Sequence, residues 1–169
     1  MTVKPYNTGQ TKKEEVREMF DNIAPKYDLL NHTLSMNIDR IWRRRVVRIV
    51  CRSRPHRILD VATGTGDLEA GLREMARTIK PGGKVVILEF SRPRNRLFRV
   101  LYEFYTYKIL PRIGGMVSKD KRAYEYLPAS VGEFPAPAEF MSMMERAGFR
   151  GCRARSQSFG IAQIYTGQR

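Results

Sequence analysis

The sequence predicts an α/β fold organised around an open, doubly wound sheet, and three stretches indicate it. Residues 57–61 form a short apolar run that enters a glycine-bearing turn, as a buried strand does before a helix. Residues 84–90 form a second apolar run of strand length, directly after a helical segment that ends in Pro-Gly-Gly. Residues 150–168 are typical of two final strands, with a turn near Phe159 and Gly160.

The turn that follows residues 57–61 is the first candidate binding site. Its string D-V-A-T-G-T-G-D covers residues 60–67, and Asp60 stands where the strand should end. Gly64 and Gly66 allow a positive φ and let a ligand approach the backbone closely. Ligands of open α/β sheets bind at this carboxyl edge, so the turn suits an adenosine-bearing ligand. The two glycines alone would equally fit an ordinary tight turn.

The charge of the chain points to anionic partners. Lys and Arg number 31 against 17 Asp and Glu, which gives a net charge of +14. No acid occurs between Arg40 and Arg57, and arginines fill one face of a helix expected over residues 38–50. A solvated face, anionic lipid headgroups and nucleic acid all fit this pattern. Cys51 and Cys152 lack metal-ligand spacing, so we expect two reduced thiols in a cytosolic protein.

The N-terminal region predicts helices and no targeting segment. Thr11 and Glu14 have the spacing of a capping box, and we expect the helix that follows to end at Pro25. Residues 27–36 predict a polar connector before the arginine-rich helix. We expect neither a signal peptide nor a membrane-spanning run, because no apolar stretch is long enough.

The second half of the chain predicts an aromatic helix. It lies within residues 92–110, and Phe104 and Ile109 fall outside the face that its other apolar residues share. A helix that is apolar on more than one side is buried, or it borders a hydrophobic ligand or a bilayer. Residues 124–131 predict a connector and residues 137–147 a further helix. The shared face consists of Phe98, Leu101, Tyr102 and Tyr105.

Several of these stretches resemble known signatures. The string at residues 60–67 resembles the first motif of class I S-adenosylmethionine-dependent methyltransferases, which have a Rossmann-like fold. Residues 27–42 resemble the N-terminal signature of the menaquinone/ubiquinone biosynthesis C-methyltransferase family (demethylmenaquinone methyltransferase-like), and residues 78–91 resemble its second signature. Residues 124–131 and 147–149 also match, so the resemblance covers nearly the whole chain in three blocks.

The chain departs from this family in the middle of the domain. A helix, a second strand with a ribose-binding acid, and two further strands should follow the turn, but a helix over residues 70–80 follows directly. The missing section amounts to about 60 residues at ~30 residues per βαβ unit. It would belong at the join formed by residues 67–69. Either these residues were omitted from the sequence or the chain is truly short; intact flanking blocks favour omission.

The resemblance implies transfer of a methyl group from S-adenosyl-L-methionine to a ring carbon of a prenylated hydroquinone, most simply demethylmenaquinol. Such an enzyme mainly positions the carbon and excludes water. By position in the signature, His32 and Asp28 are the candidates for the base that ionises the ring hydroxyl. Phe98, Tyr102 and Tyr105 are the candidate wall for the prenyl tail. The cofactor-facing residues would be Asp60, Thr63, Gly64, Thr65, Gly66 and Asp67.

The resemblance also implies a place in the cell. A prenylated substrate suggests a cytoplasmic enzyme, peripheral to the inner membrane, with its arginine face on anionic lipid. No metal is implied. Two alternatives stay open: a nucleic-acid methyltransferase that uses the basic face, although no N-P-P-Y string occurs, and a shortened, inactive chain. We expect one domain over 1–169, which comprises N-terminal helices at 1–50, the cofactor motif at 57–67, a lid or substrate region at 92–131 and a terminal strand pair at 150–168.

Overall fold

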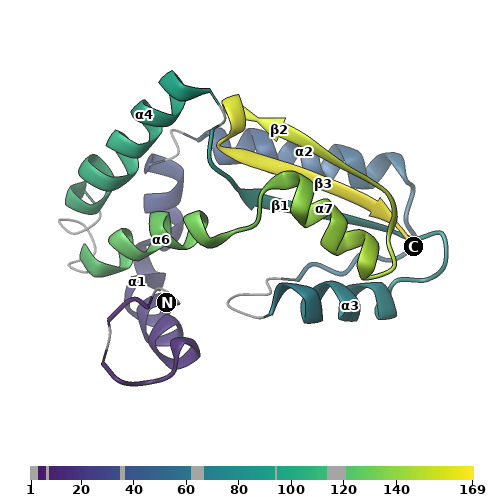
Figure 1. The fold of residues 1–169 in the computed structure, drawn as a ribbon, viewed down its shortest axis with the longest axis horizontal. Coiled ribbons are helices and arrows are strands. Elements are labelled where there is room, and N and C mark those ends of the chain that lie inside the picture. Colours follow the sequence, from purple (N-terminus) through teal and green to yellow (C-terminus); the bar gives the residue numbers. More distant parts are fainter. Residues whose placement is uncertain (1–3, 7, 35–36, 62–66, 94, 114–120) are drawn as a thin grey trace. The chain divides into compact units, whose positions relative to one another are not determined.

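A computed structural model gives the fold of the chain (Figure 1). The chain divides into two compact units. Unit 1 comprises residues 1–41 and 92–134, and unit 2 comprises residues 42–91 and 135–169. Among the described residues, no helix has the length and apolar character needed to cross a bilayer. The structure describes all residues except 1–3, 7, 35–36, 62–66, 94 and 114–120.

Unit 2 is built on a three-stranded sheet. Strand β1 (Lys84–Phe90) and strand β2 (Arg150–Gln157) both pair antiparallel with β3 (Ala162–Gln168), which gives the order β1-β3-β2. Ile87 stands opposite Tyr165, whose side chain is completely buried. The strand expected over residues 84–90 and the terminal strand pair are therefore confirmed.

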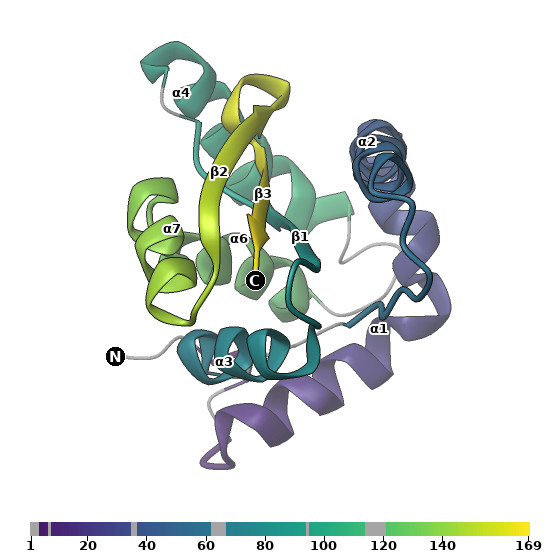
Figure 2. The ribbon, with the colours of Figure 1, turned by 90° about the vertical axis from the view of Figure 1, so that its right-hand side faces the viewer.

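Two helices lie on opposite sides of this sheet (Figures 1 and 2). On one side, α7 (Pro137–Arg146) places the Phe140 ring 4.7 Å from that of Tyr165. On the other side, the Trp42 ring of α2 (Ile38–Arg52) meets Phe90 edge-on at 5.9 Å. The sheet thus buries apolar side chains on both faces, as an α/β sheet does.

Helix α3 (Leu68–Thr78) packs against α7 through its buried Leu72 and Ala76.

Polar contacts hold the turn between the last two strands of unit 2. A turn of 3-10 helix, η2 (Ser158–Gly160), joins β2 to β3. The Ser91 hydroxyl at the end of β1 donates a hydrogen bond of 2.6 Å to the Gly160 carbonyl. The Trp42 indole donates one of 2.9 Å to the Ser158 hydroxyl, which fixes α2 beside the turn.

Unit 1 consists of helices. They are α1 (Lys12–Leu34), α4 (Arg96–Phe104), the π-helical turn η1 (Tyr105–Ile109) and α6 (Lys121–Glu133). Lys12 pairs with Glu133 at 3.3 Å, which joins the start of α1 to the end of α6.

The expected capping box is present at the start of α1. The Thr11 amide donates to the Glu14 carboxylate at 2.9 Å, and the Glu14 amide donates to the Thr11 hydroxyl at 3.3 Å. The buried carboxylate of Glu15 accepts the amides of Tyr6 at 2.9 Å and Thr8 at 2.8 Å. These bonds hold the residues that precede α1 against the helix.

Two expected connectors are helical instead. Helix α1 continues through Pro25 to Leu34, so the expected end at Pro25 and most of the connector over residues 27–36 are wrong. Residues 124–131 lie inside α6, so that connector is also wrong. A proline removes one donor and crowds the preceding turn at a cost of about 3 kcal/mol, which bonding along the rest of the helix offsets.

The expected buried strand over residues 57–61 is wrong as well. These residues have no regular structure, and Ile58, Leu59 and Val61 are 68%, 74% and 51% exposed. A strand forms only when a neighbour satisfies its backbone groups. In the described part of the chain the sheet contains β1, β2 and β3 alone, and none of them pairs with this segment.

Candidate functional site

The candidate cofactor site begins at Asp60. Its side chain is exposed, so its carboxylate is accessible to a ligand. Thr63, Gly64, Thr65 and Gly66 lie outside the described residues. Asp67 closes the motif and is the N-cap of α3, where its carboxylate accepts the amides of Glu69 at 2.8 Å and Ala70 at 3.1 Å. Asp67 therefore has a structural role that the sequence did not reveal.

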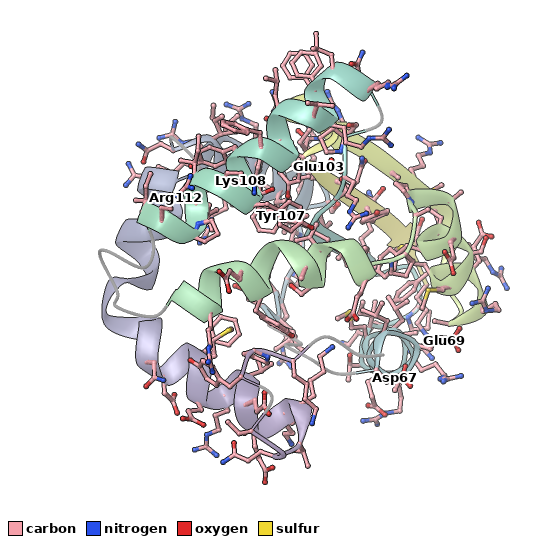
Figure 3. The ribbon with its side chains drawn as sticks, turned by 60° about the vertical axis from the view of Figure 1, so that its left-hand side comes forward. Asp67, Glu69, Glu103, Tyr107, Lys108 and Arg112 are labelled. Carbon is pink, nitrogen blue, oxygen red and sulfur yellow. The ribbon has the colours of Figure 1, made fainter. Side chains whose placement is uncertain are left out.

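A further hydrogen bond lies at the join. The Asp67 carbonyl accepts the Gly71 amide at 2.9 Å, which is the i to i+4 bond of a continuous helical turn. Figure 3 shows Asp67 and Glu69 together at this end of α3. The helix therefore begins directly after the cofactor motif, and the expectation that a section was omitted from the sequence here stays a prediction.

The two candidate bases lie in α1. Asp28 and His32 both fall within the helix. They are separated by four positions, which places them on one side of it. Their side chains are outside the part that the structure describes, so their role as proton acceptors stays a prediction.

The three candidate substrate residues lie on one continuous helical segment. Phe98 and Tyr102 belong to α4 and Tyr105 begins η1. Burial raises the pKa of Tyr102 to about 12, with a further rise from Tyr107 and a smaller opposing effect from Arg92. Burial also raises the pKa of Tyr105. Both phenols are neutral near pH 7, so they can donate a hydrogen bond but cannot act as bases.

Sequence reasoning missed the arginine beside this cluster. A Cβ at Gly132 of α6 would collide with the terminal Nη2 of Arg92, so the guanidinium lies directly against the helix backbone. Arg92 also acts electrostatically on Tyr102. A glycine inside a helix was the available signal, because glycine there is unfavourable unless something approaches closely.

Glu89 is a second group that sequence reasoning missed. It lies at the carboxyl end of β1, opposite the buried Gln163 of β3. Burial raises the pKa of the Glu89 carboxyl, and a hydrogen bond from the Phe90 backbone opposes this. The signal was an acid at the end of an apolar strand, where functional groups of α/β sheets gather.

The described residues contain no group of three or more His, Cys, Asp or Glu side chains suited to a metal ion. Cys51 and Cys152 are both free thiols in the structure. Burial raises the pKa of the Cys152 thiol, which keeps it protonated near pH 7.

Comparison with protein families matches both sides of the join. The model described as "ubiE/COQ5 methyltransferase family" matches residues 8–72 and, separately, residues 67–169. The two matches meet at residues 67–72, where the sequence predicted the break. The family likeness therefore extends over nearly the whole chain, and one internal section of the family is missing.

Individual relatives give the size of that section. "Ubiquinone/menaquinone biosynthesis C-methyltransferase UbiE" of Geobacter sulfurreducens is 37% identical over 230 residues, covering 94% of this chain and 90% of the relative. "Demethylmenaquinone methyltransferase" of Deinococcus radiodurans is 33% identical over 234 residues, covering 98% and 97%. The Bacteroides fragilis (strain YCH46) protein of that name is 32% identical over 235 residues, covering 97% and 96%.

The match of 230 residues takes in 94% of the 169 residues of this chain, which is about 159 residues, so about 71 of its positions have no counterpart here. This number is close to the expected loss of about 60 residues. The three-stranded sheet of unit 2 is accordingly part of a Rossmann-like sheet. The chain belongs to the ubiE/COQ5 methyltransferase family, whose members are class I S-adenosylmethionine-dependent C-methyltransferases.

Proposed function

We propose that this chain methylates a ring carbon of a prenylated hydroquinone, and that the substrate is demethylmenaquinol. The observation that supports this most is the match of both halves of the chain to the family. The names of the Deinococcus radiodurans and Bacteroides fragilis relatives favour the naphthoquinol substrate. The nucleic-acid alternative has no comparable support, because the named relatives act in quinone biosynthesis.

Bound S-adenosylmethionine would supply an already activated methyl group, so the protein has to bind, orient and exclude water. One described side chain fits such a ligand: the exposed Asp60 carboxylate can accept hydrogen bonds from its amino group. Thr63, Gly64, Thr65 and Gly66 are proposed to present backbone N–H groups to its carboxylate. Asp67 is proposed to act indirectly, because its carboxylate caps α3 and so fixes the end of the turn.

The aromatic cluster is proposed to receive the substrate. Phe98 and the neutral phenols of Tyr102 and Tyr105 offer an apolar wall with hydrogen-bond donors. Removal of the ring-hydroxyl proton makes the quinol a stronger nucleophile, and Asp28 or His32 is proposed to accept that proton. A Phe98→Ala, Tyr102→Ala variant should bind a long-tailed quinol more weakly than a tail-less one. Equal affinity for both would remove the cluster from the substrate site.

The prenyl tail also suggests where the enzyme works. A cytoplasmic enzyme that is peripheral to the inner membrane would meet a substrate dissolved in lipid. The exposed arginine face of α2 is proposed to lie on anionic headgroups there. This face comprises Arg40, Arg43, Arg44, Arg45 and Arg48.

The direct test is methyl transfer from radiolabelled S-adenosylmethionine to demethylmenaquinol by the 169-residue chain. We expect labelled menaquinol, and less of it from the Asp60→Ala variant. The Geobacter sulfurreducens relative serves as the positive control under identical conditions. Transfer by the relative but not by this chain would contradict the proposal.

One observation favours a second candidate, a shortened chain without activity. The segment that leads into the cofactor turn is unpaired, and its Ile58 and Leu59 side chains are 68% and 74% exposed. A turn without a fixed strand before it is poorly organised for binding. Calorimetry distinguishes the two candidates: heat of binding with S-adenosylmethionine supports the enzyme, and its absence at millimolar ligand supports the inactive chain.

A further inference from the structure

Helix α4 has an apolar stripe that faces away from the protein. Its residues follow the i, i+3, i+4, i+7 spacing of one helix side. None of the residues of α4 is buried. Four aliphatic or aromatic side chains this exposed, on adjacent turns of one helix, form a continuous apolar surface. The stripe comprises Leu97 (67% exposed), Val100 (56%), Leu101 (57%) and Phe104 (60%).

The stripe is separate from the side of the helix that the proposed substrate would use. Tyr102 is half-buried, and Thr106, one turn further on, is 5% exposed. At 100° per residue, Tyr102 lies about 160° around the helix from Phe104. The side of the helix that carries Tyr102 is therefore the less exposed one, and the stripe lies on the more exposed side.

Basic side chains lie beside and beyond the stripe. Arg96 is exposed about 40° around the helix from Val100, and Lys108 and Arg112 are exposed beyond α4, where the helix continues to Ile113. Arg99 is also exposed, but it lies on the side of Tyr102, about 60° from it. Figure 3 shows Lys108 and Arg112 further along this helix, with the Arg112 guanidinium 3.1 Å from the Lys108 carbonyl. Glu103 is the single acid between residues 92 and 113. A helix with an apolar stripe and basic flanks has the pattern of an interfacial membrane helix.

We propose that the outer stripe of α4 inserts into the surface of a bilayer that contains anionic phospholipids. Arg96 and Lys108 would keep their charges at the headgroups while the apolar side chains enter the acyl boundary. The biological reason for this insertion rests on the proposed function, because insertion would bring the enzyme to a substrate dissolved in lipid. The insertion itself requires no methyl transfer.

Charge selects the bilayer over a second copy of this chain. Two α4 helices packed stripe to stripe would bring their arginines together, and like charges at such distances repel. The net charge of +14 increases that repulsion between copies. An anionic bilayer attracts these basic residues, whereas a second copy repels them. Each basic residue near the bilayer surface contributes about a fivefold gain in binding affinity.

Co-sedimentation of the full chain with vesicles of phosphatidylcholine and phosphatidylglycerol tests the stripe. The Leu97→Gln, Leu101→Gln variant should bind at least about tenfold more weakly, because two buried apolar side chains are lost. Ile58→Gln with Leu59→Gln is the matched control, since those side chains are 68% and 74% exposed on unit 2. Equal loss in both variants would overturn the proposal.

A separate variant tests how much the basic residues contribute to vesicle binding. Arg96→Gln with Lys108→Gln should weaken binding to the anionic vesicles by about 25-fold at ~0.1 M salt. The same pair should leave the weak binding to pure phosphatidylcholine vesicles unchanged. Wild-type binding that ignores phosphatidylglycerol content, or that persists undiminished at ~0.5 M salt, would contradict the proposal.

Depth of insertion separates a membrane contact from simple charge attraction. Trp42 is the only tryptophan of the chain and is 4% exposed, so its fluorescence should not respond to lipid. A Val100→Trp variant adds a reporter to the stripe, and acyl-brominated lipids should quench it. If brominated lipids do not quench the fluorescence of the vesicle-bound Val100→Trp variant, the stripe does not insert and the proposal is overturned.

Two further results would also decide against the bilayer. A dimer by light scattering without vesicles that Leu97→Gln with Leu101→Gln converts to monomer would assign the stripe to a second copy. Tighter binding to RNA than to anionic vesicles, lost in the Arg96→Gln, Lys108→Gln variant, would assign the basic flanks to nucleic acid. Vesicle binding by a chain that fails to methylate would refute the proposed function and leave this inference standing.

Discussion

At the scale of single residues, Glu89 should make stability depend on pH. Burial raises its pKa in the folded chain above the ordinary value near 4.5, so the folded state binds the proton more tightly than the unfolded state. Stability is then highest below that value and falls as the pH rises through the raised pKa. Glu89→Gln should therefore raise the melting temperature near pH 7 and change it little near pH 4.

Melting curves at the two pH values check this, with Glu18→Gln on α1 as the control. Glu18 is exposed, so its replacement should shift neither curve. A Glu89→Gln variant that melts below the wild type near pH 7 would show that the carboxylate makes a favourable contact in the folded chain.

Ser91 makes a different contribution at the same end of β1. Its hydroxyl is buried and donates to the Gly160 carbonyl at 2.6 Å, which joins β1 to the η2 turn. Ser91→Ala leaves that carbonyl without this donor and should lower the free energy of unfolding by about 1–2 kcal/mol in urea titrations. Ser142→Ala is the control, because the Ser142 hydroxyl bonds its own helix on the surface. Equal losses would argue against the buried bond.

At the scale of elements, Asp67 is expected to matter for α3 more than for ligand charge. It caps the helix with bonds to the Glu69 and Ala70 amides. Asp67→Ala should destabilise the chain by about 1 kcal/mol in urea titrations, and Asp67→Asn by much less, because asparagine also caps well. If Asp67→Asn weakens S-adenosylmethionine binding without changing stability, the carboxylate also contacts the cofactor directly.

The sequence predicted those elements whose determinants are local. The strand over residues 84–90 and α7 each combine an apolar pattern with clear ends, and both are present. The terminal pair is also present, although β2 has the largely polar sequence Arg-Gly-Cys-Arg-Ala-Arg-Ser-Gln. The strand over residues 57–61 has the same kind of apolar pattern but needs a neighbour, and none of the described strands supplies it. Likewise, the local sequence around Pro25 could not predict that α1 continues past this residue. Tertiary packing, rather than local helix preference, decides whether a helix continues through a proline.

Both parts of the candidate site stay predictions. A single string of residues indicates the cofactor turn, which lies outside the described residues, and aromatic spacing indicates Tyr102, which is half-buried. Arg92 and Gly132 lie 40 positions apart, so their contact could not be read from either stretch alone. The sequence placed Phe104 and Ile109 outside the shared apolar face of the aromatic helix. Only the fold shows that an exposed stripe of four apolar side chains lies on α4.

At the scale of the whole molecule, one internal loss accounts for several features together. About 71 positions of the match to the Geobacter sulfurreducens relative have no counterpart in this chain, and the two family matches meet at residues 67–72. On the near side of the break, residues 57–61 are unpaired and exposed. On the far side, β1 forms an edge of the described sheet. Both are what removal of intervening strands leaves behind.

Restoring the section should therefore restore the strand. Insertion of the corresponding residues of the Geobacter sulfurreducens relative between Asp67 and Leu68 would provide neighbours for residues 57–61. We expect the amides of this segment to exchange at least about tenfold more slowly in the chimera, because they become hydrogen-bonded. We also expect S-adenosylmethionine to bind more tightly, since a paired strand fixes the turn that follows it.

An insertion of equal length made of glycine and serine is the matched control, because it separates Asp67 from Leu68 without supplying strands. It should leave exchange at residues 57–61 fast, as expected of the exposed segment in this chain. If the control slows exchange as much as the chimera does, the strand is limited by the short connection to α3. If neither insertion slows it, residues 57–61 are not the strand that their apolar pattern indicates, and the cofactor turn must be organised by other contacts.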